Sequence, residues 1–192
     1  MTSLNDQHAY VDALDGAIPW RVGDLASAQA LVSQGFASPD TLVASGASNG
    51  GLLVAEATNA DPGMFAAVTC RVPVTDMLRY TKFTFGRIWI EELGDPDVED
   101  EFHALLAYSP VHNVKDGRRY PRIVVTTAEA DDRAVPAHAF KYVATLQNAD
   151  IGPGPFVLRI ERGAGHGQGK PATKLMDEFA DLWAFARARM DA

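Results

Sequence analysis

One short run, residues 46–51 (GASNGG), constrains the possible fold more than any other part of the chain. Residues 41–45 (TLVAS) before it are apolar and partly β-branched, as in a buried strand, and residues 52–57 (LLVAEA) after it favour a helix. Strand, Gly-x-Ser-x-Gly and helix in this order are typical of the sharp turn that presents a serine nucleophile above an α/β sheet. The run therefore predicts an α/β fold with Ser48 as the candidate nucleophile.

The same run has a simpler interpretation. A Gly-x-Ser-x-Gly sequence is common by chance, and Ser48 would then only cap a helix that follows a strand. If Ser48 is a nucleophile, the backbone amide of Asn49 and the start of the helix point to the place where negative charge develops on the reacting carbonyl. Asn49 is therefore the candidate oxyanion donor.

A serine nucleophile on this turn needs an acid and a histidine later in the chain, in that order. The predicted strand 122–127 is followed by Asp131 and Asp132, and open α/β sheets place their active groups beyond the carboxyl ends of the strands. The predicted strand 155–161 is followed by His166 among four glycines, in a loop that suits a base which transfers a proton. Chemistry alone leaves both aspartates open as the acid.

Strand and helix patterns alternate along the whole chain. Strands are expected over 41–46, 66–71, 122–127 and 155–161, and helices over 24–33, 50–60, 76–81, 136–148 and 171–190. This alternation predicts a mostly parallel sheet with helices on both faces. Residues 82–120 are less regular, with short helices expected near 99–107. An irregular arm is expected over 1–22, ahead of a single domain over 23–192.

The composition restricts partners and compartment. With 47% hydrophobic and 22% charged residues, the chain has the balance of a globular protein, and its formal net charge of −8 argues against a nucleic-acid partner. The single cysteine, Cys70, lies in an apolar run and is expected to be a buried packing residue. No signal peptide or membrane-spanning run is evident, so cytoplasmic residence is expected. The five scattered histidines form no recognisable metal site, and no cofactor is expected.

Several further motifs accompany the serine turn. They are 46–54 (GASNGGLLV), 76–78 (DML), 108–114 (YSPVHNV), 131–133 (DDR) with 135–136 (VP), and 164–167 (AGHG) with 169–171 (GKP). In this order and at these spacings they resemble the C-terminal part of the prolyl oligopeptidase family of serine peptidases, from about residue 24 onward. The resemblance implies an α/β-hydrolase fold and hydrolysis of short peptides after proline through an acyl-enzyme. It also implies a catalytic set of Ser48, His166 and Asp131, the first of the two aspartates.

The resemblance implies a substrate pocket as well. Arg133 occupies the position of an arginine that binds a substrate backbone carbonyl, and Trp89 that of an indole that stacks on the proline ring of the substrate. Val74 and Ala134 would line the same pocket. A flat aromatic face suits a rigid apolar ring that has no N–H to satisfy. The alternative for Trp89 is a half-buried packing residue.

The chain also departs from the family pattern. Relatives carry a β-propeller and the first strands of the hydrolase sheet before this region, together with a tyrosine that is one of two oxyanion donors. Here Tyr10 is the only tyrosine before the serine turn, Pro73 replaces a glycine, and Leu93 replaces an aromatic residue. Two alternatives therefore stay open, a serine esterase or acylaminoacyl hydrolase of the same fold and an inactive fragment with an incomplete oxyanion hole. A partner or a second copy is expected to cover the exposed sheet edge.

Overall fold

The computed structural model describes residues 19–167 and 170–190, and it is built on a four-stranded sheet. The strands β1 (Val43–Ala47), β2 (Ala67–Arg71), β3 (Arg122–Ala128) and β4 (Phe156–Glu161) are parallel and lie side by side in sequence order. The predicted parallel α/β sheet is thus confirmed, and every strand begins and ends within two residues of its expected bounds.

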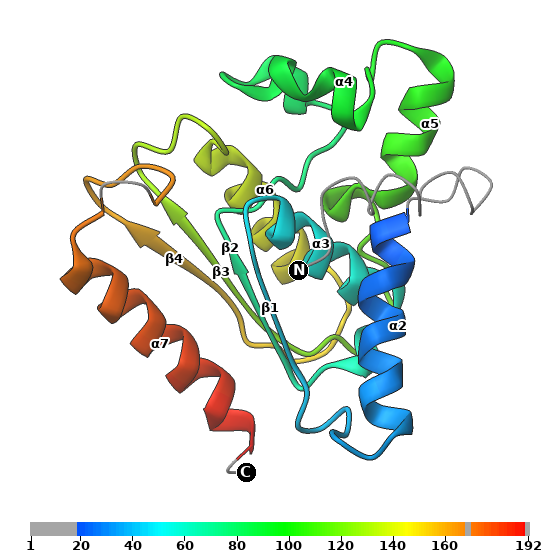
Figure 1. Cartoon of the computed structure of the whole chain (residues 1–192), viewed down its shortest axis with the longest axis vertical. Helices are drawn as coiled ribbons and strands as arrows, with labels where there is room; N and C mark the ends of the chain where they lie inside the picture. The colour runs from blue at the N-terminus through cyan, green and yellow to red at the C-terminus, as the bar shows by residue number, and fades with distance from the viewer. Residues whose placement is uncertain (1–18, 168–169, 191–192) are drawn as a thin grey trace.

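Helices cover both faces of this sheet (Figure 1). α3 (Asn49–Ala60) packs on β1 and β2, and α6 (Pro136–Asn148) packs on β3 and β4. α7 (Ala172–Met190) crosses the opposite face over β2 and β3, and α2 (Pro19–Ser33) packs against α3. In the part of the chain that the structure describes, no helix is both long enough and apolar enough to cross a membrane.

The first helix begins earlier than expected. α2 starts at Pro19, whereas the apolar spacing predicted a start near residue 24. Proline suits the first turn of a helix because the amide that it lacks has no intrahelical partner there. The predicted arm over 1–22 lies mostly outside the described residues, and the division into an arm and a single domain stays a prediction.

The connection between β2 and β3 consists of short helices. Another short helix, η1 (Pro62–Met64), precedes β2, and the connection itself contains η2 (Tyr80–Lys82), η3 (Gly86–Trp89), α4 (Ile90–Leu93), α5 (Glu99–Tyr108) and η4 (Pro110–His112). α5 confirms the helix expected near 99–107. The helix expected over 76–81 is wrong, because only the single turn η2 forms there.

Distant residues bind the backbone amides before η2. The amides of Thr75 and Asp76 donate to Nδ1 of His138, at 3.2 and 3.1 Å, and the amide of Met77 donates to Oγ of Ser109 at 3.0 Å. These partners come from α6 and from the residue after α5. Long-range hydrogen bonds thus fix the segment before η2 on the rest of the fold.

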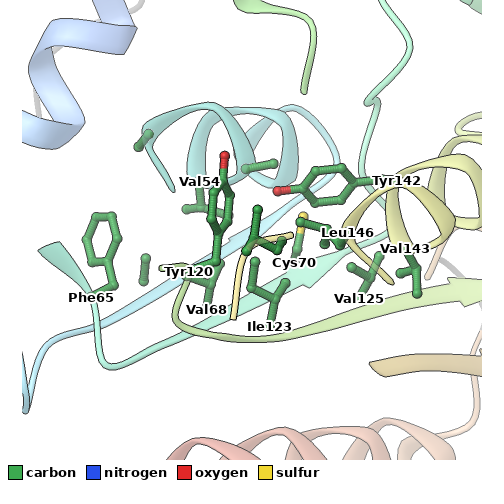
Figure 2. Close-up of a cluster of buried hydrophobic side chains, with 14 of the residues drawn as sticks. Val54, Phe65, Val68, Cys70, Tyr120, Ile123, Val125, Tyr142, Val143 and Leu146 are labelled. Atoms are coloured by element: carbon green, nitrogen blue, oxygen red, sulfur yellow. The ribbon is translucent and has the colours of Figure 1, made fainter. Parts of the chain in front are cut away.

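The main core lies between the sheet and the pair α3 and α6 (Figure 2). Alternate residues of the central strands point to this side, as the two-residue period of a strand requires. The layer is formed by Val68, Cys70, Ile123 and Val125 of the strands and Val54, Tyr142, Val143 and Leu146 of the helices. Each fully buried aliphatic side chain contributes about 1.5–3 kcal/mol, so this layer fixes both helices on the strands.

Cys70 is buried as expected. Its thiol lies 3.1 Å from the carbonyl oxygen of Gly51, and burial raises the pKa of the thiol. The residue therefore packs in its neutral form beneath the helix that follows the serine turn.

A polar cluster joins the chain after β2 to α6. The side chain of Asp76 is fully buried, and one of its carboxylate oxygens lies 2.5 Å from Nζ of Lys141 and 3.3 Å from a guanidinium nitrogen of Arg79. Burial alone would raise the pKa of Asp76, but Lys141 and Arg79 hold it below its usual value. The neighbouring His138 is buried as well, and burial lowers its pKa to about 4.

This buried histidine should make stability depend on pH. Between pH 6.5 and 4 the unfolded chain binds a proton at His138 that the native chain does not, so stability is lost as the pH falls. A shift of about 2.5 pKa units corresponds to about 3 kcal/mol. We expect the free energy of unfolding in urea to fall by about that amount between pH 7 and pH 4 on account of His138.

His138→Asn isolates this contribution, because the asparagine Oδ1 can accept from the same two amides and does not titrate. The variant should lose most of the pH dependence between 6.5 and 4. His103→Asn changes an exposed histidine and should behave as the native chain does. An unchanged pH dependence in His138→Asn would contradict the expectation.

Candidate active site

Ser48 lies on a tight turn between β1 and α3. Its backbone adopts φ 58° and ψ −119°, a strained conformation for a residue other than glycine, and its amide donates to the carbonyl of Arg71 at 2.8 Å. A Cβ on Gly46 would lie 1.9 Å from the carbonyl oxygen of Gly50. Only glycine at position 46 therefore lets the strand and the helix approach closely enough to form this turn.

Asp131 lies three residues beyond the end of β3, with a buried side chain. Its Oδ1 accepts from the backbone amides of Arg133 at 3.0 Å and Ala134 at 2.8 Å. These two bonds fix the orientation of the carboxylate, with Oδ2 directed at His166. Asp132 is exposed, so of the two aspartates that the sequence left open the structure brings Asp131 to the histidine.

His166 lies five residues beyond the end of β4 and bridges the other two side chains. Its Nδ1 is 2.7 Å from Oδ2 of Asp131, and its Nε2 is 2.9 Å from Oγ of Ser48. A carboxylate can only accept hydrogen bonds, so Nδ1 carries the proton and Nε2 is free to accept from the serine hydroxyl. This arrangement can withdraw a proton from Ser48 as its oxygen attacks a carbonyl.

Backbone hydrogen bonds join the loops that carry the acid and the histidine. The amide of Ala130 donates to the carbonyl of Ala164 at 3.0 Å, and the amide of Glu129 donates to that of Glu161 at 2.9 Å. The ladder between β3 and β4 thus extends past the ends of both strands. Asp131 and His166 are positioned by one continuous pairing of the chain.

Asn49 is the first residue of α3. Amides in the first turn of a helix have no intrahelical acceptor, and they lie at the positive end of the helix dipole. The amides of Gly51 and Leu52 are used within the turn, since both donate to the carbonyl of Ser48. The position of Asn49 is compatible with the predicted donation to an oxyanion.

The predicted pocket residues fall into two groups. Val74 and Ala134 are buried in one apolar cluster, and the half-buried Trp89 packs against it with its ring stacked on Tyr80 (centroids 6.5 Å apart, planes 16° apart). Arg133 is exposed on the loop of the acid. The structure thus brings Trp89, Val74 and Ala134 together. One face of the indole packs on Tyr80, so for that face Trp89 is a half-buried packing residue, as in the alternative interpretation.

Sequence reasoning missed one contact in this region. The hydroxyl of Thr84 donates to the backbone carbonyl of Asp132 and ties the segment that carries Trp89 to the loop of the acid. No local pattern marks Thr84, because the two partners lie 48 residues apart.

The chain is similar to known proteins. The model of the prolyl oligopeptidase family matches residues 23–192. Prolyl oligopeptidase A of Amanita bisporigera is 41% identical over 168 residues, which make up 86% of this chain and 22% of the fungal protein. Prolyl endopeptidase of Elizabethkingia miricola is 43% identical over 167 residues, which make up 86% of this chain and 24% of the bacterial protein.

The fold is shared with solved structures as well. A post-proline cleaving enzyme from Rickettsia typhi superposes with a TM-score of 0.79 at 33% identity, over 87% of this chain and 24% of that protein. The chain therefore spans less than a quarter of the length of the relatives that it matches. Because the family model covers nearly all of the described residues, the chain belongs to the prolyl oligopeptidase family.

Proposed function

We propose that this chain carries the catalytic centre of a serine peptidase that hydrolyses short peptides after proline. The observation that supports this most is the pair of hydrogen bonds from His166, to Ser48 at 2.9 Å and to Asp131 at 2.7 Å, in a member of the prolyl oligopeptidase family. In this proposal Ser48 is the nucleophile, His166 the general base and then the general acid, and Asp131 the group that orients the imidazole.

The reaction proceeds in two steps. Oγ of Ser48 bonds to the scissile carbonyl carbon while its proton passes to Nε2 of His166, and the carbonyl oxygen becomes an oxyanion near the amide of Asn49. The C–N bond then breaks as His166 returns the proton to the leaving amine, which leaves an acyl-enzyme. Water then attacks the carbonyl carbon of the acyl-enzyme in the same way, with His166 as its base. This step releases the acid product and restores Ser48.

Substrate specificity is assigned to the apolar cluster that contains Val74 and Ala134, next to the loop that carries Asp131. Val74 and Ala134 form an apolar wall, and the indole of Trp89 offers an aromatic face to a proline ring. Arg133, the exposed residue before Ala134, is proposed to bind a backbone carbonyl of the peptide through its guanidinium. The single domain over 23–192, cytoplasmic residence and a partner on the sheet edge also stay predictions.

A fluorophosphonate tests the proposal without presupposing a substrate, because it reacts with any activated serine. We expect one adduct in the intact mass of the native chain, and peptide mapping should place it on Ser48. A folded chain that forms no adduct would refute the enzyme proposal and favour an inactive fragment.

Substrate preference is then measured with matched peptides that carry proline or alanine before the scissile bond, and with a simple ester. A preference for the proline peptide supports the peptidase assignment. Equal cleavage of both peptides with faster ester hydrolysis would favour the esterase alternative instead.

A further inference from the structure

A buried ion pair joins Lys170, which follows the histidine loop (residues 162–167), to Glu178 of α7. Nζ of Lys170 is 2.5 Å from Oε2 of Glu178, and each side chain is only 6% exposed. The second oxygen of the same carboxylate, Oε1, accepts from the hydroxyl of Thr126 on β3 at 2.7 Å. Glu178 thus joins the chain after His166 to the strand that leads to Asp131.

A second lysine of α7 holds the other end of the histidine loop. Lys174 lies one turn before Glu178 on the same face of the helix, and its Nζ donates to the carbonyl of Arg162 at 2.6 Å. Arg162 is four residues before His166, and Lys170 is four residues after it. Side chains of α7 therefore bind the chain on both sides of the histidine, at Arg162 and at Lys170.

The histidine loop needs such external support. Gly163 and Gly167 adopt φ values of 60° and 117°, which other residues rarely reach, so the loop has little conformational preference of its own. Glycines also supply no side chains to pack. The 2.9 Å contact between Nε2 of His166 and Oγ of Ser48 must therefore be maintained by groups outside the loop.

A buried ion pair at this place is unusual if its role is only to stabilise the fold. Removing two charges from water is costly, and apolar residues of similar size often serve stability equally well. What a buried pair adds is a fixed geometry, because each charge must meet its partner. Burial alone would raise the pKa of Glu178, but the bonds from Lys170 and Thr126 hold it below its usual value, so the carboxylate stays ionised.

We propose that Lys170 and Glu178 are positioning residues of the active site, which hold His166 in reach of Ser48 by fastening the histidine loop to α7 and β3. The inference rests on the function proposed above. Neither residue contacts the reacting atoms, and both act through the placement of the imidazole.

The test compares two lysine variants at a temperature where both are folded. Lys170→Met removes the ion-pair partner of Glu178, and the control Lys141→Met removes one of the two cations that pair with the buried Asp76, on residues outside the histidine loop. Both should be less stable than the native chain. Only Lys170→Met should slow the fluorophosphonate reaction and lower kcat, by about 100-fold as expected for a misplaced catalytic group, with KM nearly unchanged.

The double variant Lys170→Met, Glu178→Leu separates positioning from stability. Removing both charges should recover most of the lost stability while the slow reaction persists. Recovery of the native rate in the double variant would overturn the proposal, because apolar packing would then position His166 as well as the ion pair does. Equal loss of rate in Lys141→Met and Lys170→Met would overturn it too.

Amide hydrogen exchange gives a readout that does not need activity. The amides of Ala130 and Gly163 join the acid and histidine loops, through bonds to the carbonyl of Ala164 and to the carboxylate of Glu129. In Lys170→Met both should exchange at least about tenfold faster, while the amides inside β3 keep their native rates. If the native chain forms no fluorophosphonate adduct, the proposed function fails alone, and unchanged exchange at these two amides would refute the anchoring itself.

Discussion

Replacing Ser48 with alanine should lower kcat/KM for a prolyl peptide by on the order of 10⁶, the loss seen when the nucleophile of a serine peptidase is removed. The reason is chemical, since no other hydroxyl lies within reach of Nε2 of His166 among the contacts that the structure describes. The variant should bind the same peptide with nearly native affinity and form no fluorophosphonate adduct. Activity is measured with the purified chain, and affinity by calorimetry.

Two variants make this test specific. Ser45→Ala changes a serine of β1 whose hydroxyl accepts from that of Thr69 on β2 at 2.8 Å, and it should keep nearly native activity. Ser48→Ala combined with His166→Ala should be no slower than Ser48→Ala alone, because residues that act as a unit are not additive. Substantial activity in Ser48→Ala, or a further large loss in the double variant, would contradict the proposed roles.

Replacing Asp131 with asparagine should lower kcat by about 10⁴ while the fold is retained. Oδ1 of Asp131 accepts from two backbone amides, so an asparagine would keep its oxygen there and turn its NH₂ group toward His166. Nδ1 must then accept, which moves the proton of the neutral imidazole to Nε2. In that tautomer His166 cannot take the proton of Ser48.

Asp132→Asn is the matched control, because it makes the same chemical change at the adjacent, exposed carboxylate. It should change kcat by less than about twofold, and thermal unfolding should show both variants to be folded. A loss in Asp132→Asn comparable to that in Asp131→Asn would reverse the choice between the two aspartates.

Much of this architecture could be predicted because its signals are local. The strands are short apolar runs between turn residues, and the turn at Ser48 needs glycine at position 46 for a steric reason that leaves a mark in the sequence. The bounds of β1 and β4 are accordingly close to the expected ones. The resemblance to the family, rather than chemistry alone, separated Asp131 from Asp132.

What escaped prediction depends on contacts between distant segments. A helix is expected over 76–81, but only the single turn η2 forms there, and the amides of Thr75 and Asp76 before it are bound by His138, more than sixty residues away in the sequence. The pairing of Lys170 with Glu178 and the bond from Thr84 to Asp132 leave no periodic trace either. Such contacts form only once the sheet has brought the segments together.

The order of the strands has a consequence for loop length. Ser48 follows β1 by one residue, Asp131 follows β3 by three, and His166 follows β4 by five, so each loop is longer the farther its strand lies from β1. Three strand spacings of about 4.8 Å put β4 about 14 Å from the serine, and five extended residues reach about 17 Å. The five-residue spacing is thus long enough for the histidine to reach back across β3 and β2 to the serine.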